Sequence, residues 1–95
     1  MRVGVSGGLE IAFGGEREFD IPFAAEQVLV TDVIDEMAKR IKANGGDEDI
    51  FLQDGLVRPG ILVLINDADW ELLDKEDSVI SNADNMHFSS TLHGG

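Results

Sequence analysis

The chain ends in Gly94-Gly95, a dipeptide whose main chain could itself take part in a reaction. A carboxylate is a poor electrophile, because its charge repels nucleophiles and oxide is a poor leaving group. A mixed anhydride with AMP removes both obstacles and lets sulfur or an amine attack the carbonyl carbon. Because glycine has no Cβ, two glycines form a thin thread that can approach an ATP site inside another protein. The sequence therefore predicts that the Gly95 carboxyl group is the reactive centre.

No other group of residues has the spacing of a catalytic or metal site. His93 has no acidic residue near it in sequence that could orient it as a general base. Asp67 and Asp69 flank Ala68, but a calcium loop needs a longer series of oxygen ligands that ends in Glu, and we interpret the two aspartates as turn residues. The chain contains no cysteine, which excludes disulfides, thiolate metal sites and a cysteine nucleophile. We therefore expect neither a catalytic residue nor a bound metal.

The charge balance restricts the partners. Nineteen acidic residues against seven basic ones give a net charge of −12, with a pI of about 4.2. Phosphates would repel such a protein, which argues against direct binding to nucleic acid or to an anionic membrane. A partner with a basic docking surface would be attracted from a distance. Alternatively, the acids serve only to keep a small domain soluble.

The length and the apolar runs predict one soluble domain. A chain of 95 residues can bury a thin but sufficient core. No apolar run approaches the roughly 20 residues that cross a bilayer. The segment Met1 to Val5 lacks the apolar stretch of a signal peptide. We expect a cytoplasmic protein.

The N-terminal third alternates apolar and polar residues, as strands do. A first strand is predicted from Arg2 to Ser6, and the period of two resumes from Leu9 to Phe13. After the turn Gly14-Gly15, a further alternating run covers Phe19 to Phe23, with Pro22 near a strand end. The pattern predicts an N-terminal hairpin joined by a glycine turn.

A helix is predicted from Thr31 to about Asn44. Its apolar residues fall on one stripe, with Thr31 or Asp32 as the N-cap. Acidic residues occupy its first turn and basic residues its last turn, which complements the helix dipole. Gly45 or its neighbours supply the left-handed residue that ends the helix.

The C-terminal half predicts three more strands. Ile61 to Ile65 is a continuous apolar strand, Trp70 to Leu73 a short strand with Trp70 in the core, and Met86 to Phe88 the last strand. The order of elements predicts an α+β domain over residues 1–90. Its fold would be a ubiquitin-like β-grasp, with a mixed sheet of four to five strands and one main helix across one face. Residues 91–95 would form a flexible reactive tail.

Two motifs carry a family resemblance. The segment from Val57 to Leu73 (VRPGILVLINDADWELL) closely resembles the signature of the ubiquitin-related modifier family, and the tail from Ser90 to Gly95 (STLHGG) is similar to that family's terminal motif. The resemblance is strong over the C-terminal 40 residues or so and weak from Gly14 to Leu52. The two motifs stand at their proper places, which makes the pair more specific than a terminal Gly-Gly alone.

The resemblance implies a carrier protein, and the chain would not be an enzyme. A separate activating enzyme would use ATP to adenylate Gly95, with Thr91, Leu92, His93 and Gly94 as the tail that enters its channel. No cofactor would be bound to the monomeric carrier itself. In one fate, the activating and sulfurtransferase enzyme transfers a persulfide sulfur to the activated Gly95 carbonyl, and Gly95 then ends in a thiocarboxylate. A separate tRNA thiolase then passes that sulfur to the wobble uridine of tRNA.

In the other fate, the activated terminus is joined to lysines of target proteins, as ubiquitin is.

Two further functions remain possible from the residues alone. The chain could serve only one half of this role, as a modifier without sulfur transfer or as a carrier for a thiolated cofactor. It could also be a β-grasp interaction domain in which the terminal Gly-Gly is incidental.

A docking surface is predicted on the open face of the sheet. Both faces of the strand Ile61 to Ile65 are apolar, yet one helix can cover only one of them. We assign Ile61, Val63 and Ile65 to the core, because three β-branched residues fill it better than two leucines. Leu62 and Leu64 would then lie outward beside His87 and Ser89, as a modest apolar patch ringed by acids. The alternatives are the opposite register or a loop that covers this face.

Overall fold

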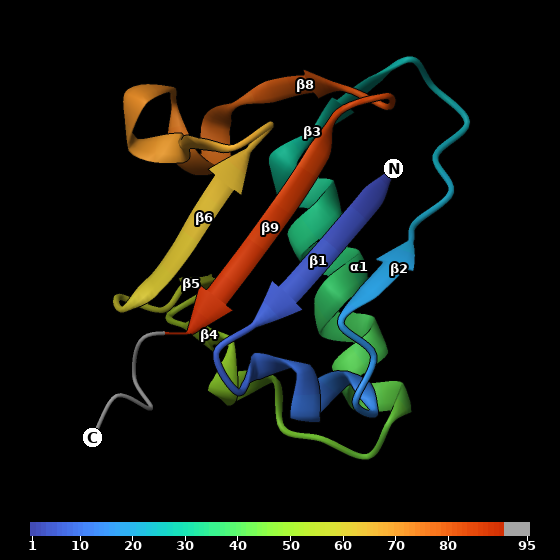
Figure 1. The fold of residues 1–95 in the computed structure, drawn as a ribbon, viewed down its shortest axis with the longest axis vertical. Helices are drawn as coiled ribbons and strands as arrows, with labels where there is room; N and C mark the ends of the chain where they lie inside the picture. The colour runs from blue at the N-terminus through green and yellow to red at the C-terminus, as the bar shows by residue number, and fades with distance from the viewer. Residues whose placement is uncertain (91–95) are drawn as a thin grey trace.

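Five strands form one mixed sheet in the computed structural model, which describes residues 1–90 (Figure 1). In order across the sheet they are β2 (Glu18–Asp20), β1 (Arg2–Ser6), β9 (Asn85–Ser90), β6 (Ile61–Ile65) and β7 (Ala68–Asp69). β1 and β9 run parallel, and the other neighbours are antiparallel. The predicted α+β fold, a β-grasp with a mixed sheet of four to five strands, is confirmed.

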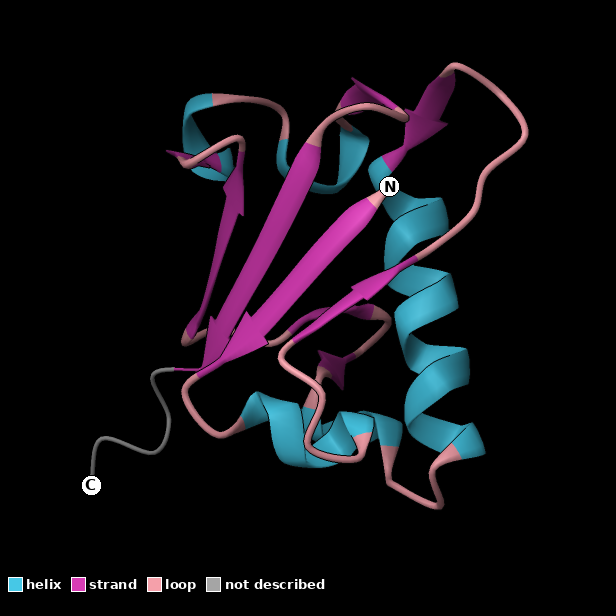
Figure 2. Ribbon diagram, turned by 45° about the vertical axis from the view of Figure 1, so that its right-hand side comes forward, coloured by secondary structure: helices cyan, strands magenta, loops and turns pink. Residues whose placement is uncertain are grey.

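One helix, α1 (Val30–Ala43), crosses one face of the sheet, and the other face is open toward the viewer in Figure 1. Figure 2 shows the helix to the right of the strands, as a separate layer. Its apolar stripe is buried, and comprises Val30, Val33, Ile34, Met37, Ala38 and Ile41. The sheet contributes side chains from β1, β6 and β9 to the same core, among them Val3, Val63 and Phe88. Burial of these stripes fixes which face of the sheet remains open.

The start of α1 differs from the prediction. The N-cap position is Leu29, no side chain caps the helix, and Thr31 and Asp32 lie inside its first turn. β3 (Gln27–Leu29) runs straight into the helix and pairs with β8 (Val79–Ser81), and the Val30 N–H donates to the Ser78 carbonyl at 3.1 Å. Pairing between distant segments therefore sets where the helix begins, and a capping side chain is not needed.

The end of α1 follows the prediction. Gly45 has φ +79°, in the left-handed region. The Gly46 N–H donates to the Ile41 carbonyl at 2.9 Å. Glycine adopts this conformation without the Cβ clash of other residues, which explains why the helix stops here.

The predicted strand Leu9 to Phe13 is wrong. These residues form the 3₁₀-helix η1 (Leu9–Phe13), which buries Leu9 and Phe13 and leaves Ile11 73% exposed. The Glu10 carboxylate accepts from the Gly8 N–H at 2.9 Å and so stabilises a turn at the place where a strand would continue. The antiparallel partner of β1 is β2, which ends at Asp20, two residues before Pro22.

The predicted strand Trp70 to Leu73 is also wrong. Trp70–Leu72 is the 3₁₀-helix η3, and the strand β7 precedes it. The Asp69 side chain accepts from the Glu71 N–H at 2.9 Å, which caps a helical turn. Trp70 is 7% exposed, so its predicted place in the core is confirmed.

Short elements complete residues 1–90. They are η2 (Glu48–Ile50), the hairpin of β4 (Leu52–Gln53) and β5 (Leu56–Val57), and η4 (Lys75–Asp77). None of the helices in this range has both the length and the apolar character that a membrane span requires.

Candidate functional site

The central strand β9 leads to the predicted reactive tail. β9 lies between β1 and β6, and its last residue, Ser90, is in register with Ile61 (Figure 1). The predicted site residues that follow, Thr91, Leu92, His93, Gly94 and Gly95, lie outside the described residues. The structure does describe Ser90, the residue that precedes them. Ser90 is the last residue of β9, a strand that is paired on both sides.

The predicted in-and-out assignment of β6 is confirmed. Ile61, Val63 and Ile65 are at most 8% exposed, whereas Leu62 is 41% exposed and Leu64 is half-buried. Side chains alternate along a strand, so the two leucines point to the open face.

The four residues predicted as a docking surface come together on this face. Leu62 is in register with Ser89, and Leu64 with His87, on the neighbouring strand β9. Directly paired residues have Cβ atoms about 5 Å apart. We call Leu62, Leu64, His87 and Ser89 the open-face patch. It extends along β6 and β9 to the end of β9 at which Ser90 stands.

His87 is held in place by two residues of β1 that sequence reasoning did not single out. Its Nε2 atom lies 2.8 Å from the Ser6 Oγ atom. A Cβ at Gly4 would lie 2.5 Å from the His87 Nδ1 atom, closer than such atoms can approach. The imidazole therefore lies across β1 in space that only glycine leaves free. A lone glycine inside the alternating run Val3-Gly4-Val5 was the signal for such a close approach.

A hollow of about 390 Å³ adjoins His87 on the open face. Leu64 and Gly4 contribute to its lining, and the acidic residues Glu18 and Asp67 do so as well. Arg2 also lines it, with its Nη1 atom 3.9 Å from the Glu18 carboxylate. The hollow has the volume of a small pocket.

Of the two aspartates considered as metal ligands, Asp67 is a turn residue, as predicted, whereas Asp69 is the last residue of β7 and caps η3. Asn66 and Asp67, with φ +49° and +68°, form the turn between β6 and β7. Asn66 is fixed by its own side chain, which donates to the Asp84 carboxylate and accepts from the Asn85 N–H, both at 2.9 Å. Within residues 1–90, no three His, Cys, Asp or Glu side chains are grouped so that they could hold a metal.

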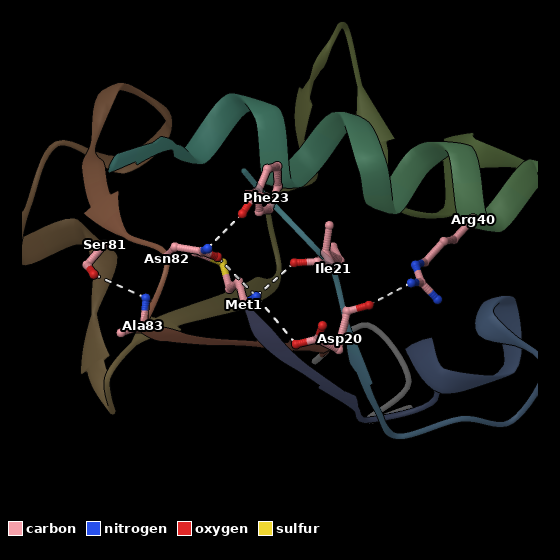
Figure 3. A network of polar contacts seen from close by, with 8 residues as sticks. All are labelled: Met1, Asp20, Ile21, Phe23, Arg40, Ser81, Asn82 and Ala83. Atoms are coloured by element: carbon pink, nitrogen blue, oxygen red, sulfur yellow. Dashed lines mark hydrogen bonds and ion pairs between the residues drawn. The ribbon is translucent and has the colours of Figure 1, made fainter. Parts of the chain in front are cut away.

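A polar network holds Met1 at the start of β1, at the opposite end of the strand from Gly7 (Figure 3). The Met1 amine donates to the Ile21 carbonyl at 2.8 Å and to the Asn82 Oδ1 atom at 3.2 Å, and it lies 3.4 Å from the Asp20 carboxylate. Asn82 in turn donates to the Phe23 carbonyl at 2.8 Å. The network ties β1 to the loop before β9 and so helps to fix the register of the parallel pair. Sequence reasoning missed it because its members are up to 81 positions apart.

Arg40 protects the outer edge of β2. Its guanidinium stacks 4.6 Å from the Phe19 ring centroid and donates to the Asp20 carbonyl at 2.8 Å. A charged side chain at an exposed strand edge discourages pairing with another chain. Arg40 therefore disfavours pairing of another chain with the edge strand β2.

Known proteins resemble this chain over its full length. The sequence matches the family model described as Urm1 (Ubiquitin related modifier) over residues 1–95. It is 42% identical over 92 residues to the ubiquitin-related modifier 1 homolog of Culex quinquefasciatus, a match that covers 95% of this chain and 82% of that protein. It is also 42% identical over 96 residues to ubiquitin-related modifier 1 of Saccharomyces cerevisiae strain YJM789, which covers 100% of this chain and 97% of that protein.

A solved structure agrees with the sequence matches. The solution structure of Urm1 from Trypanosoma brucei superposes with a TM-score of 0.71 at 32% identity, over 99% of this chain and 93% of that one. The sequence signature and the β-grasp topology therefore point the same way. The chain belongs to the ubiquitin-related modifier family.

Proposed function

We propose that the chain is a sulfur carrier and a protein modifier that acts through Gly95. The observation that carries this proposal is the family match, which covers residues 1–95 and so includes the terminal motif. The described structure supports it, because β9 presents the tail from the end of a central strand beside the open-face patch.

The chemistry is assigned to partners, and this chain supplies the carried group. The Gly95 carboxylate attacks the α-phosphorus of ATP on an activating enzyme, and pyrophosphate leaves. The terminal sulfur of an enzyme persulfide then attacks the acyl carbon, and AMP leaves. A second thiol of that enzyme reduces the acyl disulfide, which frees a thiocarboxylate and leaves a disulfide on the enzyme. The carrier needs no cysteine for any of these steps, and it has none.

Two uses of the activated terminus belong to the proposal. A tRNA thiolase complex takes the sulfur for 2-thiolation of the wobble uridine, and the carrier does not bind the tRNA itself. The activated carbonyl is also attacked by lysine amines of target proteins, which forms an isopeptide bond. On this proposal the protein acts in the cytoplasm, as a monomer with no bound cofactor. A modifier without sulfur transfer, or a β-grasp interaction domain, is the competing proposal.

The mass of the protein taken from its own cells tests the proposal. With thiols protected, we expect a fraction in which one oxygen is replaced by sulfur, with the change confined to the C-terminal peptide. A variant that lacks Gly95 is the control and should show no such fraction. If only carboxylate and lysine conjugates are found under conditions that preserve thiocarboxylates, the protein is a modifier without sulfur transfer.

A further inference from the structure

The glycine turn after β1 lies directly against the residue from which the tail starts. Gly7 has φ +72°, and a Cβ built on it would lie 3.0 Å from the Ser90 nitrogen and 3.1 Å from the Ser89 Oγ atom. The same Cβ would overlap the Ser90 carbonyl oxygen even more closely. Two of these three atoms belong to the backbone, so no side-chain rotation can relieve the overlap.

Ser89 and Ser90 differ in their strand register. Ser89 is in register with Ser6 on one side and with Leu62 on the other. Ser90 is in register only with Ile61, because β1 has ended at Ser6 and the chain has turned away through Gly7. A side chain at position 7 would displace Ser90, because its Cβ would overlap the Ser90 carbonyl oxygen more closely than any other atom. Figure 1 shows the ends of β1 and β9 side by side.

We propose that Gly7 is a positioning residue for the reactive terminus. It lets the backbone of Ser90 lie against the turn, and it thereby fixes the place and direction from which the tail departs relative to the open-face patch. This inference rests on the proposed function, in which Gly95 is charged by an activating enzyme. The open-face patch and Ser90 must keep a fixed position relative to each other. A partner that docks on the patch can bind Gly95 in its active site only if the tail starts from the correct place and direction at Ser90.

A pair of glycine variants of the full chain tests the proposal. Gly7→Ala introduces both a Cβ in the left-handed region and the overlap with Ser90. Gly15→Ala is the matched control, because Gly15 has φ +87° but nothing within 4 Å of its Cβ position. Both variants suffer the backbone strain of alanine at positive φ, and both should unfold at a lower temperature. Only Gly7→Ala should move the start of the tail.

Charging kinetics with the activating enzyme separate positioning from stability. Well below both unfolding midpoints, Gly7→Ala should lower kcat for adenylation by roughly tenfold or more, because small misplacements of reacting groups cost this much. Its KM should stay within about twofold of the parent value, since Leu62, Leu64 and His87 keep their places and the Ser89 hydroxyl, 3.1 Å from the new Cβ, can rotate away. Gly15→Ala should keep both constants. Equal kinetics for the two variants would overturn the proposal.

Amide spectra supply a readout that does not depend on activity. In Gly7→Ala the ¹H–¹⁵N resonances of Ser90 and Ile61 should shift, and in Gly15→Ala they should not. Unmoved resonances of Ser90 in Gly7→Ala would also overturn the proposal. A variant that lacks Gly95 distinguishes the two levels of inference. If that variant is charged normally, the proposed function fails, whereas a dead Gly95 deletion with a fully active Gly7→Ala refutes only the role of Gly7.

Discussion

At the scale of single residues, the turn between β6 and β7 holds two side-chain-bearing residues in the left-handed region. Asn66 and Asp67, with φ +49° and +68°, occupy the central positions of this two-residue turn. Turns of this kind favour Asn-Gly, because the second position is then free of a Cβ clash. The native sequence therefore carries some backbone strain at Asp67.

Replacing Asp67 by glycine should stabilise the protein. We expect Asp67→Gly to raise the free energy of unfolding by about 0.5 kcal/mol, as relief of the left-handed strain outweighs the greater freedom of glycine in the unfolded chain. Urea unfolding followed by circular dichroism measures the change. Asp67→Ala, which keeps the Cβ and loses the carboxylate, should lower the stability. A loss of stability in Asp67→Gly would mean that the carboxylate itself stabilises the native state.

At the scale of elements, the two faces of β6 have different tasks. Its inward residues pack under α1, and its outward residues form half of the open-face patch. Exposed apolar groups that gather in one place usually mark a contact site. Of the two outward leucines, Leu62 lies nearer to the start of the tail, since its register partner Ser89 immediately precedes Ser90.

A double substitution on β6 should separate docking from folding. Leu62→Ser combined with Leu64→Ser should raise KM for charging by the activating enzyme, while lowering the free energy of unfolding by no more than about 1–2 kcal/mol. Val63→Ser on the same strand is the matched control, because Val63 is fully buried and its loss should cost several kcal/mol. Charging constants and urea midpoints of both variants are the measurements. A collapsed fold in the double variant, or an unchanged KM, would contradict the assignment of the open face as the docking surface.

At the scale of the whole molecule, the net charge of −12 should govern encounter with the activating enzyme. If the acids steer a basic docking surface, the association rate should fall several-fold as the salt concentration rises from about 50 mM to about 500 mM, because the Debye length shortens. The dissociation rate should change less. Stopped-flow measurements give both rates. An association rate that is independent of salt would support the alternative that the acids serve only solubility.

The sequence by itself determined the elements whose burial follows a local period. Along Ile61 to Ile65 the larger, β-branched set of alternate residues predicted which side chains are buried, and the stripe of α1 predicted its inward face. The burial of Trp70 and the outward direction of His87 also followed from local pattern. These features are readable because one face of a strand or helix meets the core and the other does not.

Only the tertiary structure decided the features that depend on partners distant in sequence. The start of α1 is set by a hydrogen bond to Ser78. The orientation of the His87 ring depends on Gly4 and Ser6, and the position of Ser90 depends on Gly7.

Leu9 to Phe13 and Trp70 to Leu72 carry strand-like or ambiguous patterns, yet they form 3₁₀-helices. In both, a carboxylate accepts a nearby backbone N–H and stabilises a turn, a local interaction that the apolar period does not record. Hydrophobic period encodes burial, whereas close approach of two backbones depends on how the strands are ordered in the sheet.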